Sequence, residues 1–374
     1  MPPVLRSAES TDRVIRLVWD DGTTSTFHHV WLRDNCLHCR HATTGHRVVE
    51  TSTIAGAAPA VVEIAEPGDL VVRWSDDHSS AYPAEWLRRH DYSNGVRRER
   101  FEPVLWDASG ARDLSTADYP TLLTDPAVKL SLMCGLRDRG VAILHGVPCE
   151  PGTVARVAEQ FGEVRTTGWG TVFDVRAEPD ANSVAYTNLP LVTHTDEAYR
   201  DPAPTIQLQH FLRTDAEGGE TTLVDGFKVA ADLRAERPDL FDLLASVSLH
   251  FHFRDDSNEH EHDAPVIELG TAGDVRAVRY SNHSVQPFLL PADQMEAYYE
   301  AYTAFGRMRE SDRYRVTIRL AAGDLYMVDN RRVLHGRTGF RSGGERHLQS
   351  CYIERDEFTS RLRVLARERR SAVR

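Results

Sequence analysis

The chain has 374 residues, a formal net charge of −12 and 5 cysteines. This length allows one large domain or two unequal ones, and the acidic balance argues against binding to nucleic acid. No apolar run is long enough to span a lipid bilayer, and the first residues lack the apolar stretch of a signal peptide. We therefore expect a soluble, cytoplasmic protein with no membrane partner. The odd number of scattered cysteines is not the pattern of a disulfide framework.

An internal repeat lies near the N-terminus. The interval from Trp19 to Trp31 equals the interval from Trp74 to Trp86. Each copy has the pattern of a strand, a tight polar turn, a second strand and the start of a helix. The repeat predicts a small β-rich domain, which we place at residues 1–95. Packing explains its tryptophans more simply than chemistry does.

The rest of the chain, residues 96–374, begins within a polar and charged stretch that is typical of a domain boundary. Apolar residues from Pro126 to Arg139 follow helical spacing, and Gly140 is placed to end that helix. The sequence therefore predicts that this second domain opens with helical structure before its strands begin.

Strand-like runs dominate from residue 205 onward, and helical patterns interrupt them at residues 228–245 and 291–308. Many short strands with few long helices are typical of a β-sandwich or jelly roll rather than of a parallel α/β sheet. The predicted fold class is mainly β with flanking helices (α+β).

A possible metal site is formed by two histidines and one aspartate. His194 and Asp196 are two residues apart, so their side chains project from the same face of an extended strand. His335 follows a strand-like run that ends at Asp329. Two imidazoles and one carboxylate leave one face of a metal open, which is the donor set of non-heme iron centres. Each residue alone is better explained by a hydrogen bond or by core packing, but together they favour the metal.

Longer motifs carry a resemblance to a known family. The segments 31–36, 328–337 and 346–349, with Tyr352 near the end, resemble the γ-butyrobetaine and trimethyllysine hydroxylase branch of the Fe(II)/2-oxoglutarate-dependent dioxygenases, in the TauD/TfdA-like superfamily. The resemblance covers nearly the whole chain in order. It implies a double-stranded β-helix, or jelly-roll, catalytic core that follows a small β-rich N-terminal domain. Periodicity alone does not distinguish this core from other β-sandwiches.

The resemblance also implies the cofactor and co-substrates. Fe(II) would be held by the two histidines and the aspartate, and 2-oxoglutarate and O2 would be co-substrates. By the same resemblance Arg346 binds the distal carboxylate of 2-oxoglutarate, a role that suits the forked guanidinium. Thr221 is expected to add a hydroxyl, and Gln209 to lie near the co-substrate. The alternative for Arg346 is a surface salt bridge.

An aromatic cage for the substrate is implied at four positions: Trp169, Phe173, Tyr186 and Tyr352. Aromatic faces hold a quaternary ammonium group by cation–π attraction, because that group has no N–H to donate. The alternative is that these residues are ordinary core aromatics.

The acidic end of the substrate is less clearly indicated. Ser183 stands where γ-butyrobetaine hydroxylases carry an asparagine that helps to position the substrate, whereas Asn282 matches a polar position of the family. We predict a hydroxylase of a small quaternary-ammonium acid, first of all γ-butyrobetaine, with L-carnitine as the product of a carnitine biosynthesis step. Alternatives are a trimethylammonium phosphonate or trimethyllysine as substrate, or a jelly-roll binding protein without catalysis. A homodimer is expected from the relatives.

A structural zinc site is also implied by the resemblance. Cys36 and Cys39 stand where the family usually has three cysteines, and His78 matches its distant histidine ligand. The fourth ligand would be His38 or His41. The alternative is a segment held by hydrogen bonds and tryptophan packing.

Overall fold

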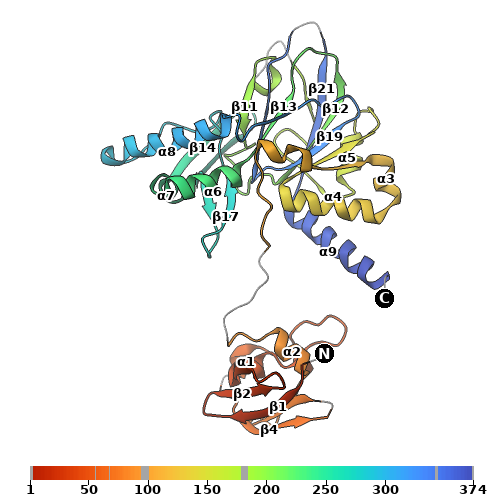
Figure 1. The fold of residues 1–374 in the computed structure, drawn as a ribbon, viewed down its shortest axis with the longest axis vertical. Helices are drawn as coiled ribbons and strands as arrows, with labels where there is room; N and C mark the ends of the chain where they lie inside the picture. Colours follow the sequence, from red (N-terminus) through yellow and green to blue (C-terminus); the bar gives the residue numbers. More distant parts are fainter. Residues whose placement is uncertain are drawn as a thin grey trace. The chain divides into compact units, whose positions relative to one another are not determined.

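A computed structural model describes residues 3–54, 56–66, 68–93, 101–177, 184–341 and 344–372. Its internal contacts divide the chain into two compact units, Met1–Phe101 and Glu102–Arg374, which are described separately (Figure 1). In the described part of the chain, no helix is long and apolar enough to cross a lipid bilayer.

The first unit contains the two copies of the repeat. Each copy pairs its strands antiparallel and continues into a short helix. The elements are β1 (Leu5–Ser10), β2 (Val14–Trp19), β3 (Thr24–His28) and α1 (His29–Asp34), then β4 (Pro59–Ala65), β5 (Asp69–Trp74), β6 (Ser79–Tyr82) and α2 (Ala84–Arg89). Trp19 and Trp74 are buried, and each indole N–H donates to a serine six positions further on, Ser25 and Ser80, at 2.7 and 2.9 Å. These two tryptophans are core residues.

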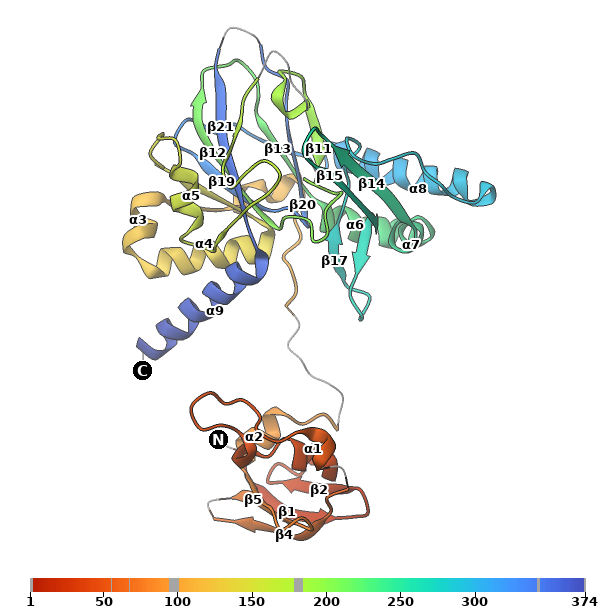
Figure 2. The same cartoon turned by 180° about the vertical axis from the view of Figure 1, so that it is seen from behind.

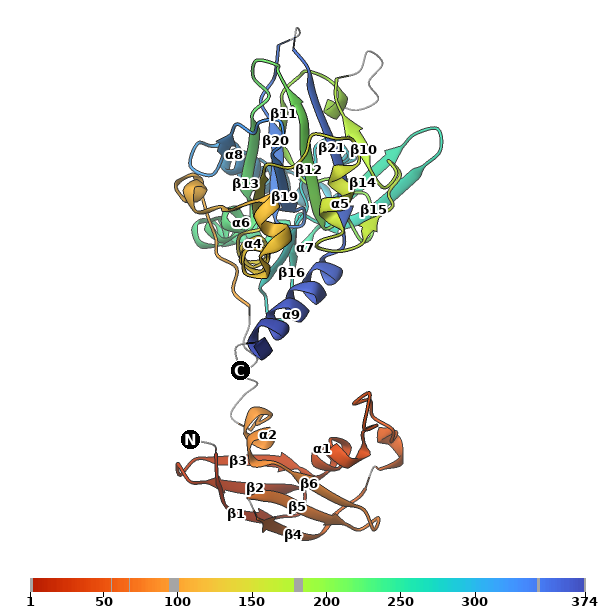
Figure 3. The same ribbon diagram turned by 90° about the vertical axis from the view of Figure 1, so that its right-hand side faces the viewer.

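The second unit is built on two facing groups of strands, which confirms the predicted jelly-roll class (Figure 3). The larger sheet has the order β10-β21-β12-β19-β8-β7, with β9 beside β21, and the smaller sheet has the order β11-β20-β13-β18. The strands of the larger sheet are β7 (Ser115–Asp118), β8 (Val141–His145), β9 (Val164–Arg165), β10 (Phe173–Val175), β12 (Ile206–Thr214), β19 (Leu325–Asp329) and β21 (Arg346–Ile353). Those of the smaller sheet are β11 (Leu191–His194), β13 (Thr221–Asp225), β18 (Val316–Ile318) and β20 (Val333–Arg337).

Helices cover this unit in two groups (Figure 2). One group packs its apolar side chains on the larger sheet: α3 (Tyr119–Thr124), α4 (Pro126–Arg139), α5 (Thr153–Ala158) and α9 (Arg355–Ala372). The other group shares a core with two hairpins: α6 (Gly226–Glu236), α7 (Pro238–Ser246), α8 (Ala292–Glu310), β14 (Ser248–Arg254), β15 (Glu259–Pro265), β16 (Ile267–Leu269) and β17 (Val275–Val278). Between the two sheets, a third apolar cluster joins residues of both, among them Phe211, Leu223, Val328 and Leu348.

Local sequence signals explain where the helices begin and end. Asp125 caps α4 by accepting from the backbone N–H of Ala127 at 2.7 Å, and Gly140 ends the helix with φ 77°. The helix predicted over residues 228–245 was wrong as one element, because it is broken into α6 and α7 at Arg237. Pro238 follows that break, and a proline disfavours helical backbone in the residue before it.

A buried ion pair ties the start of β20 to the end of β13. The Arg332 guanidinium donates to both carboxylate oxygens of Asp225, at 3.0 and 2.8 Å. Their side chains are 2% and 0% exposed. Asp225 also accepts from the backbone N–H groups of Trp106 and Phe227, at 3.1 Å each. The carboxylate is therefore fully hydrogen-bonded although it is out of contact with water.

We predict that Asp225→Ala lowers the free energy of unfolding of the second unit by about 3–5 kcal/mol, because it leaves the Arg332 cation buried without its partner. Glu217→Ala is the matched control, because it removes an ion pair with Arg341 whose side chains are 71% and 79% exposed. That control should cost less than about 1 kcal/mol. Urea denaturation measures both values. Equal losses of unfolding free energy in the two variants would show that the buried ion pair stabilises the unit no more than the exposed one does.

Candidate active site

The pairing of β11 with β20 brings the predicted metal ligands together. His194 and His335 are register partners across these antiparallel strands, and their ring centroids are 4.9 Å apart. Asp196 follows two residues after His194, and its Oδ1 lies 3.1 Å from His194 Nε2. Its Oδ2 lies 3.5 Å from His335 Nε2. One nitrogen from each histidine and one carboxylate oxygen all lie within 4.8 Å of one another.

Hydrogen bonds orient the first histidine. Nδ1 of His194 lies 3.0 Å from the carbonyl oxygen of Val192. A carbonyl oxygen can only accept, so Nδ1 carries a proton, and Nε2 is the nitrogen that faces the cluster. Nδ1 of His335 is buried and has no hydrogen-bond partner among the described residues.

The position of Asp196 is set by its neighbours on both sides. Its backbone N–H donates to Asn330 Oδ1 at 2.7 Å, and Asn330 Nδ2 donates back to the carbonyl oxygen of Asp196 at 3.0 Å. Burial would raise the pKa of the Asp196 carboxyl, but the charge of His335 and hydrogen bonds from both histidines hold this pKa well below its usual value. The carboxylate is therefore ionised, as a metal ligand must be.

The donor set fits iron. Two imidazole nitrogens and one carboxylate oxygen suit Fe(II), whereas a structural zinc site usually presents thiolates and Ca²⁺ or Mg²⁺ prefers oxygen ligands alone. The two histidines come from neighbouring strands of the smaller sheet, and Asp196 lies in the turn that follows β11.

The cluster opens into a cavity of about 340 Å³. This is within the usual size of a small-molecule site. Most of the residues predicted for co-substrate and substrate line it, with the cluster itself: Trp169, Phe173, Tyr186, His194, Asp196, Gln209, His335, Arg346 and Tyr352. Thr221 and Asn282 do not line it, and Ser183 lies outside the described residues.

Arg346 places a buried cation in the wall of the cavity. Its Nε donates to the carbonyl oxygen of Gly219 at 3.2 Å, and its guanidinium lies 5.5 Å from the ring centroid of Phe211. Burial lowers the pKa of Arg346, and no described carboxylate forms an ion pair with it. Gly219 has φ 74°, and a Cβ there would lie 2.9 Å from Arg346 Cδ. The glycine therefore makes room for the arginine side chain.

Aromatic rings that line the cavity form two groups of rings in contact. The Trp169 ring lies 5.9 Å from Tyr186 and 5.5 Å from Phe253, measured between centroids. Phe173 and Tyr352 are stacked at 5.7 Å. The predicted cage residues are thus brought together at one cavity.

Two polar residues that were predicted to bind co-substrate or substrate do not line the cavity. Thr221 is buried on β13, where it is the register partner of Arg337. Asn282 is exposed, and its Oδ1 accepts from the Tyr302 hydroxyl at 2.7 Å. Its neighbours Ser281 and His283 line the cavity instead.

Several cavity residues were not predicted from the sequence. Arg337 lies two residues beyond His335 on β20 and donates to the carbonyl oxygens of Ala185 and Thr187, at 3.0 and 2.6 Å. The alternation of side chains along a strand could have predicted this position, since residues two apart share a face.

Glu197 is a second cavity residue that was not predicted. It has φ 47°, and burial followed by the charge of Asp196 raises the pKa of its carboxyl to about 7. Its position directly after the H-x-D motif was the only signal for it.

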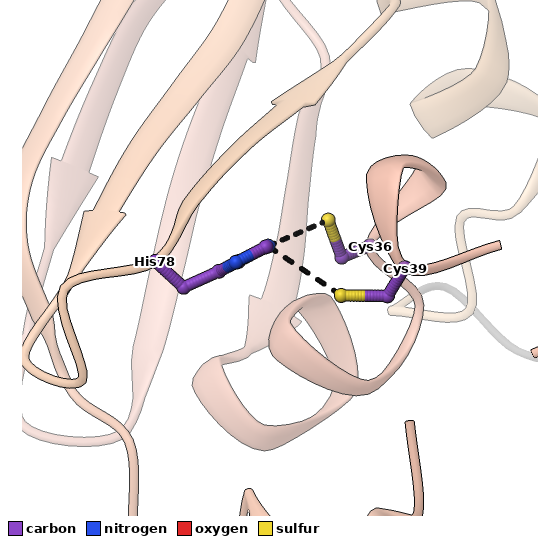
Figure 4. A group of neighbouring side chains, drawn as sticks. All are labelled: Cys36, Cys39 and His78. Atoms are coloured by element: carbon purple, nitrogen blue, oxygen red, sulfur yellow. Dashed lines mark hydrogen bonds between the residues drawn. The ribbon is translucent and has the colours of Figure 1, made fainter. Parts of the chain in front are cut away.

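A second cluster of potential metal ligands lies in the first unit (Figure 4). Nε2 of His78 lies 3.2 Å from Cys36 Sγ and 3.5 Å from Cys39 Sγ. His38 and His41 are exposed and do not belong to this group. Arg33 donates to Cys39 Sγ at 3.4 Å.

Comparisons with known proteins agree with this geometry. Residues 102–352 match the family described as taurine catabolism dioxygenase TauD, TfdA family, and residues 6–88 match gamma-butyrobetaine hydroxylase-like, N-terminal. Gamma-butyrobetaine dioxygenase of Pseudomonas sp. (strain AK-1) is 39% identical over 97% of this chain and 96% of that protein. Trimethyllysine dioxygenase of Meyerozyma guilliermondii is 27% identical over 94% of this chain and 93% of that protein.

A solved structure supports the fold. PvcB, an Fe, alpha-ketoglutarate dependent oxygenase from an isonitrile synthetic pathway, superposes with a TM-score of 0.50 and 20% identity, over 70% of this chain and 95% of that one. With the family match over most of the chain, this leaves one conclusion: the chain belongs to the TauD, TfdA family of dioxygenases.

Proposed function

We propose that this dioxygenase hydroxylates a small acid that carries a quaternary ammonium group, with γ-butyrobetaine as the first candidate. The observation that carries the proposal is that one cavity is lined both by the His194, Asp196 and His335 cluster and by aromatic rings. The similarity to a gamma-butyrobetaine dioxygenase supports the same substrate class. Trimethyllysine is the second candidate, since a trimethyllysine dioxygenase is also similar along nearly the whole chain.

In this proposal His194, Asp196 and His335 hold Fe(II). When bound, Fe(II) together with 2-oxoglutarate and O2 supplies the oxidising chemistry that places a hydroxyl group on an unreactive C–H bond. Arg346 pairs with the distal carboxylate of 2-oxoglutarate, which would otherwise be costly to bury. The cavity walls exclude water and orient the substrate carbon toward the cluster.

The aromatic rings of the cavity would bind the cationic head of the substrate. A methylated ammonium is weakly hydrated, so it loses little on leaving water and gains attraction from each ring face. A primary ammonium gives up strong hydration and then needs acceptors that ring faces do not supply. The choice of acidic tail would depend on Ser183, the position at which the chain departs from the γ-butyrobetaine hydroxylase pattern.

Substrate preference tests this function. We predict a higher kcat/KM for γ-butyrobetaine, or another trimethylammonium acid, than for the corresponding primary amine. Phe173→Ala should raise KM for the methylated compound by the equivalent of about 1–2 kcal/mol, in line with a desolvated cation–π contact. Ser183→Asn should change the preference between carboxylate and phosphonate tails but keep the need for the methylated head.

The assay couples succinate release to product formation across matched methylated and unmethylated amines with each tail. Asp196→Ala is the inactive control, since it removes the only carboxylate of the proposed iron site. A preference for primary amines would assign the enzyme to another class of substrate.

Co-substrate binding is predicted to depend on Arg346. Arg346→Ala should weaken 2-oxoglutarate binding by roughly 2–5 kcal/mol, because a buried carboxylate loses its charged partner. Substrate affinity should change much less. Calorimetry with the metal-loaded protein in the absence of oxygen measures both, with Arg341→Ala as the exposed-arginine control. An unchanged affinity for 2-oxoglutarate would move this role to another cation, such as Arg337.

We propose a structural zinc ion at Cys36, Cys39 and His78. The fourth ligand would be His38 or His41, whose exposed side chains would have to turn toward this group. Freshly purified protein should carry about one zinc per chain, and Cys39→Ser should lower its thermal stability because zinc binding contributes to folding. Cys149→Ser, which changes an exposed cysteine of the other unit, should have neither effect. Elemental analysis that finds no zinc would contradict the site.

The domain organisation is proposed on the same basis. We place a β-rich N-terminal domain at residues 1–95 and the dioxygenase domain at 96–374, and the contact division after Phe101 supports a boundary in this region. The proposed role of the N-terminal domain is to form the contact of a homodimer.

A further inference from the structure

The Asp196 carboxylate is unequal at its two oxygens. Oδ2 accepts from Gln207 Nε2 at 2.6 Å and from the Tyr352 hydroxyl at 2.6 Å. A carboxylate oxygen has two in-plane lone pairs, so two short hydrogen bonds occupy both. Oδ1 accepts neither of these bonds and lies 3.1 Å from His194 Nε2, a member of the cluster, whereas His335 Nε2 lies 3.5 Å from Oδ2, beyond the two short hydrogen bonds. Oδ1 is therefore the oxygen whose lone pairs are left to a metal.

Sheet geometry explains why both donors reach one oxygen. Gln207 on β12 and Tyr352 on β21 are register partners in antiparallel strands, so their side chains lie side by side on one face. Gln207 Nε2 lies 3.3 Å from the Tyr352 hydroxyl oxygen. Both side chains are buried and line the cavity.

The orientation of the Gln207 amide follows from its contact with Asp196. The opposite orientation would place its Oε1, in place of Nε2, 2.6 Å from a carboxylate oxygen, which is repulsive. In the observed orientation Oε1 is buried and has no hydrogen-bond partner among the described residues. Leaving that acceptor unpaired costs stability. An apolar side chain would avoid the cost but would not donate to Asp196.

The two donors differ in what else they touch. The Tyr352 ring stacks on Phe173 at 5.7 Å, so this donor is in direct contact with the aromatic wall. Gln207 holds the carboxylate from within the sheet, between β19 and β21. A shift of the aromatic wall would therefore move one donor on Oδ2 and leave the other in place.

We infer that Gln207 is a positioning residue for the metal site: it engages Oδ2 of Asp196 together with Tyr352, so that Asp196 binds the metal through Oδ1 alone. This inference rests on the proposed iron site, but it does not depend on the identity of the substrate. Gln207 would then set the geometry of the metal ligand, and Tyr352 would connect that ligand to the substrate pocket.

The test uses Gln207→Met, which keeps the length of the side chain and removes the donor. Gln349→Met is the matched control, because Gln349 is also a buried glutamine that donates to an aspartate, Asp174 at 3.2 Å, outside the cluster. Co(II) affinity is measured by calorimetry, and the Co(II) absorption spectrum is recorded on the same samples. We expect Gln207→Met to weaken Co(II) by about 10–100-fold and to change the spectrum, as loss of groups that orient metal ligands does. Gln349→Met should do neither.

Tyr352→Phe removes the second donor and keeps the ring, so it provides an independent test if Gln207→Met does not fold. It should also weaken Co(II), and the double variant should lose less than the two single losses combined because both groups act on one oxygen. In turnover, Gln207→Met should lower kcat with little change in substrate KM. Unchanged Co(II) affinity and spectrum in either single variant would overturn the inference. Weakened Co(II) binding in an enzyme that rejects every quaternary-ammonium acid would overturn the proposed substrate and leave the inference standing.

Discussion

The close pairing of β11 with β20 is the contact on which the candidate site depends, because it sets His194 opposite His335. Gly336 makes this approach possible. A Cβ at that position would lie 2.3 Å from the carbonyl oxygen of Leu191 and 3.0 Å from the backbone nitrogen of Thr193. Any other residue at this position would force the strands apart and move one imidazole away from the other. The absence of a side chain at Gly336 therefore sets the distance between His194 and His335.

Buried charge holds the surrounding strands in place. Arg332 and Asp225 neutralise each other at the entry to β20. Arg337 and Arg346 both line the cavity, and both are buried cations. Burial, followed by the charge of Arg346, lowers the pKa of Arg337 to about 10. Two neighbouring buried cations make the cavity wall favourable for an anionic ligand. This is a local property that the net charge of −12 does not reveal.

The sequence predicted the parts of the site that depend on short spacing. Residues two apart on a strand share a face, so His194 and Asp196 were expected together. The β-rich runs indicated a β-sandwich or jelly roll, and the family resemblance implied the jelly roll. Gln207 was not predicted, because its function follows from its register with Tyr352 on β21, and single-strand spacing does not determine that pairing. Pro238 could have predicted the helix break at Arg237. The break was missed because apolar residues continue at helical spacing on both sides of it.

Tyr352 shows why a residue cannot be assigned to one part of the site from its type alone. Its ring was predicted as a face of the substrate cage, a task that phenylalanine would perform as well, as Phe173 illustrates. The hydroxyl adds a second contact, because it donates to Asp196 Oδ2 at 2.6 Å. Burial, with the charges of Asp196 and Glu197, raises the pKa of this phenol well above its usual value, so the oxygen keeps its proton and remains a donor. One side chain thus places its ring beside Phe173 at the cavity and its hydroxyl on Asp196. In the proposed enzyme, a substrate held by this ring would therefore be coupled to the geometry of the Asp196 carboxylate.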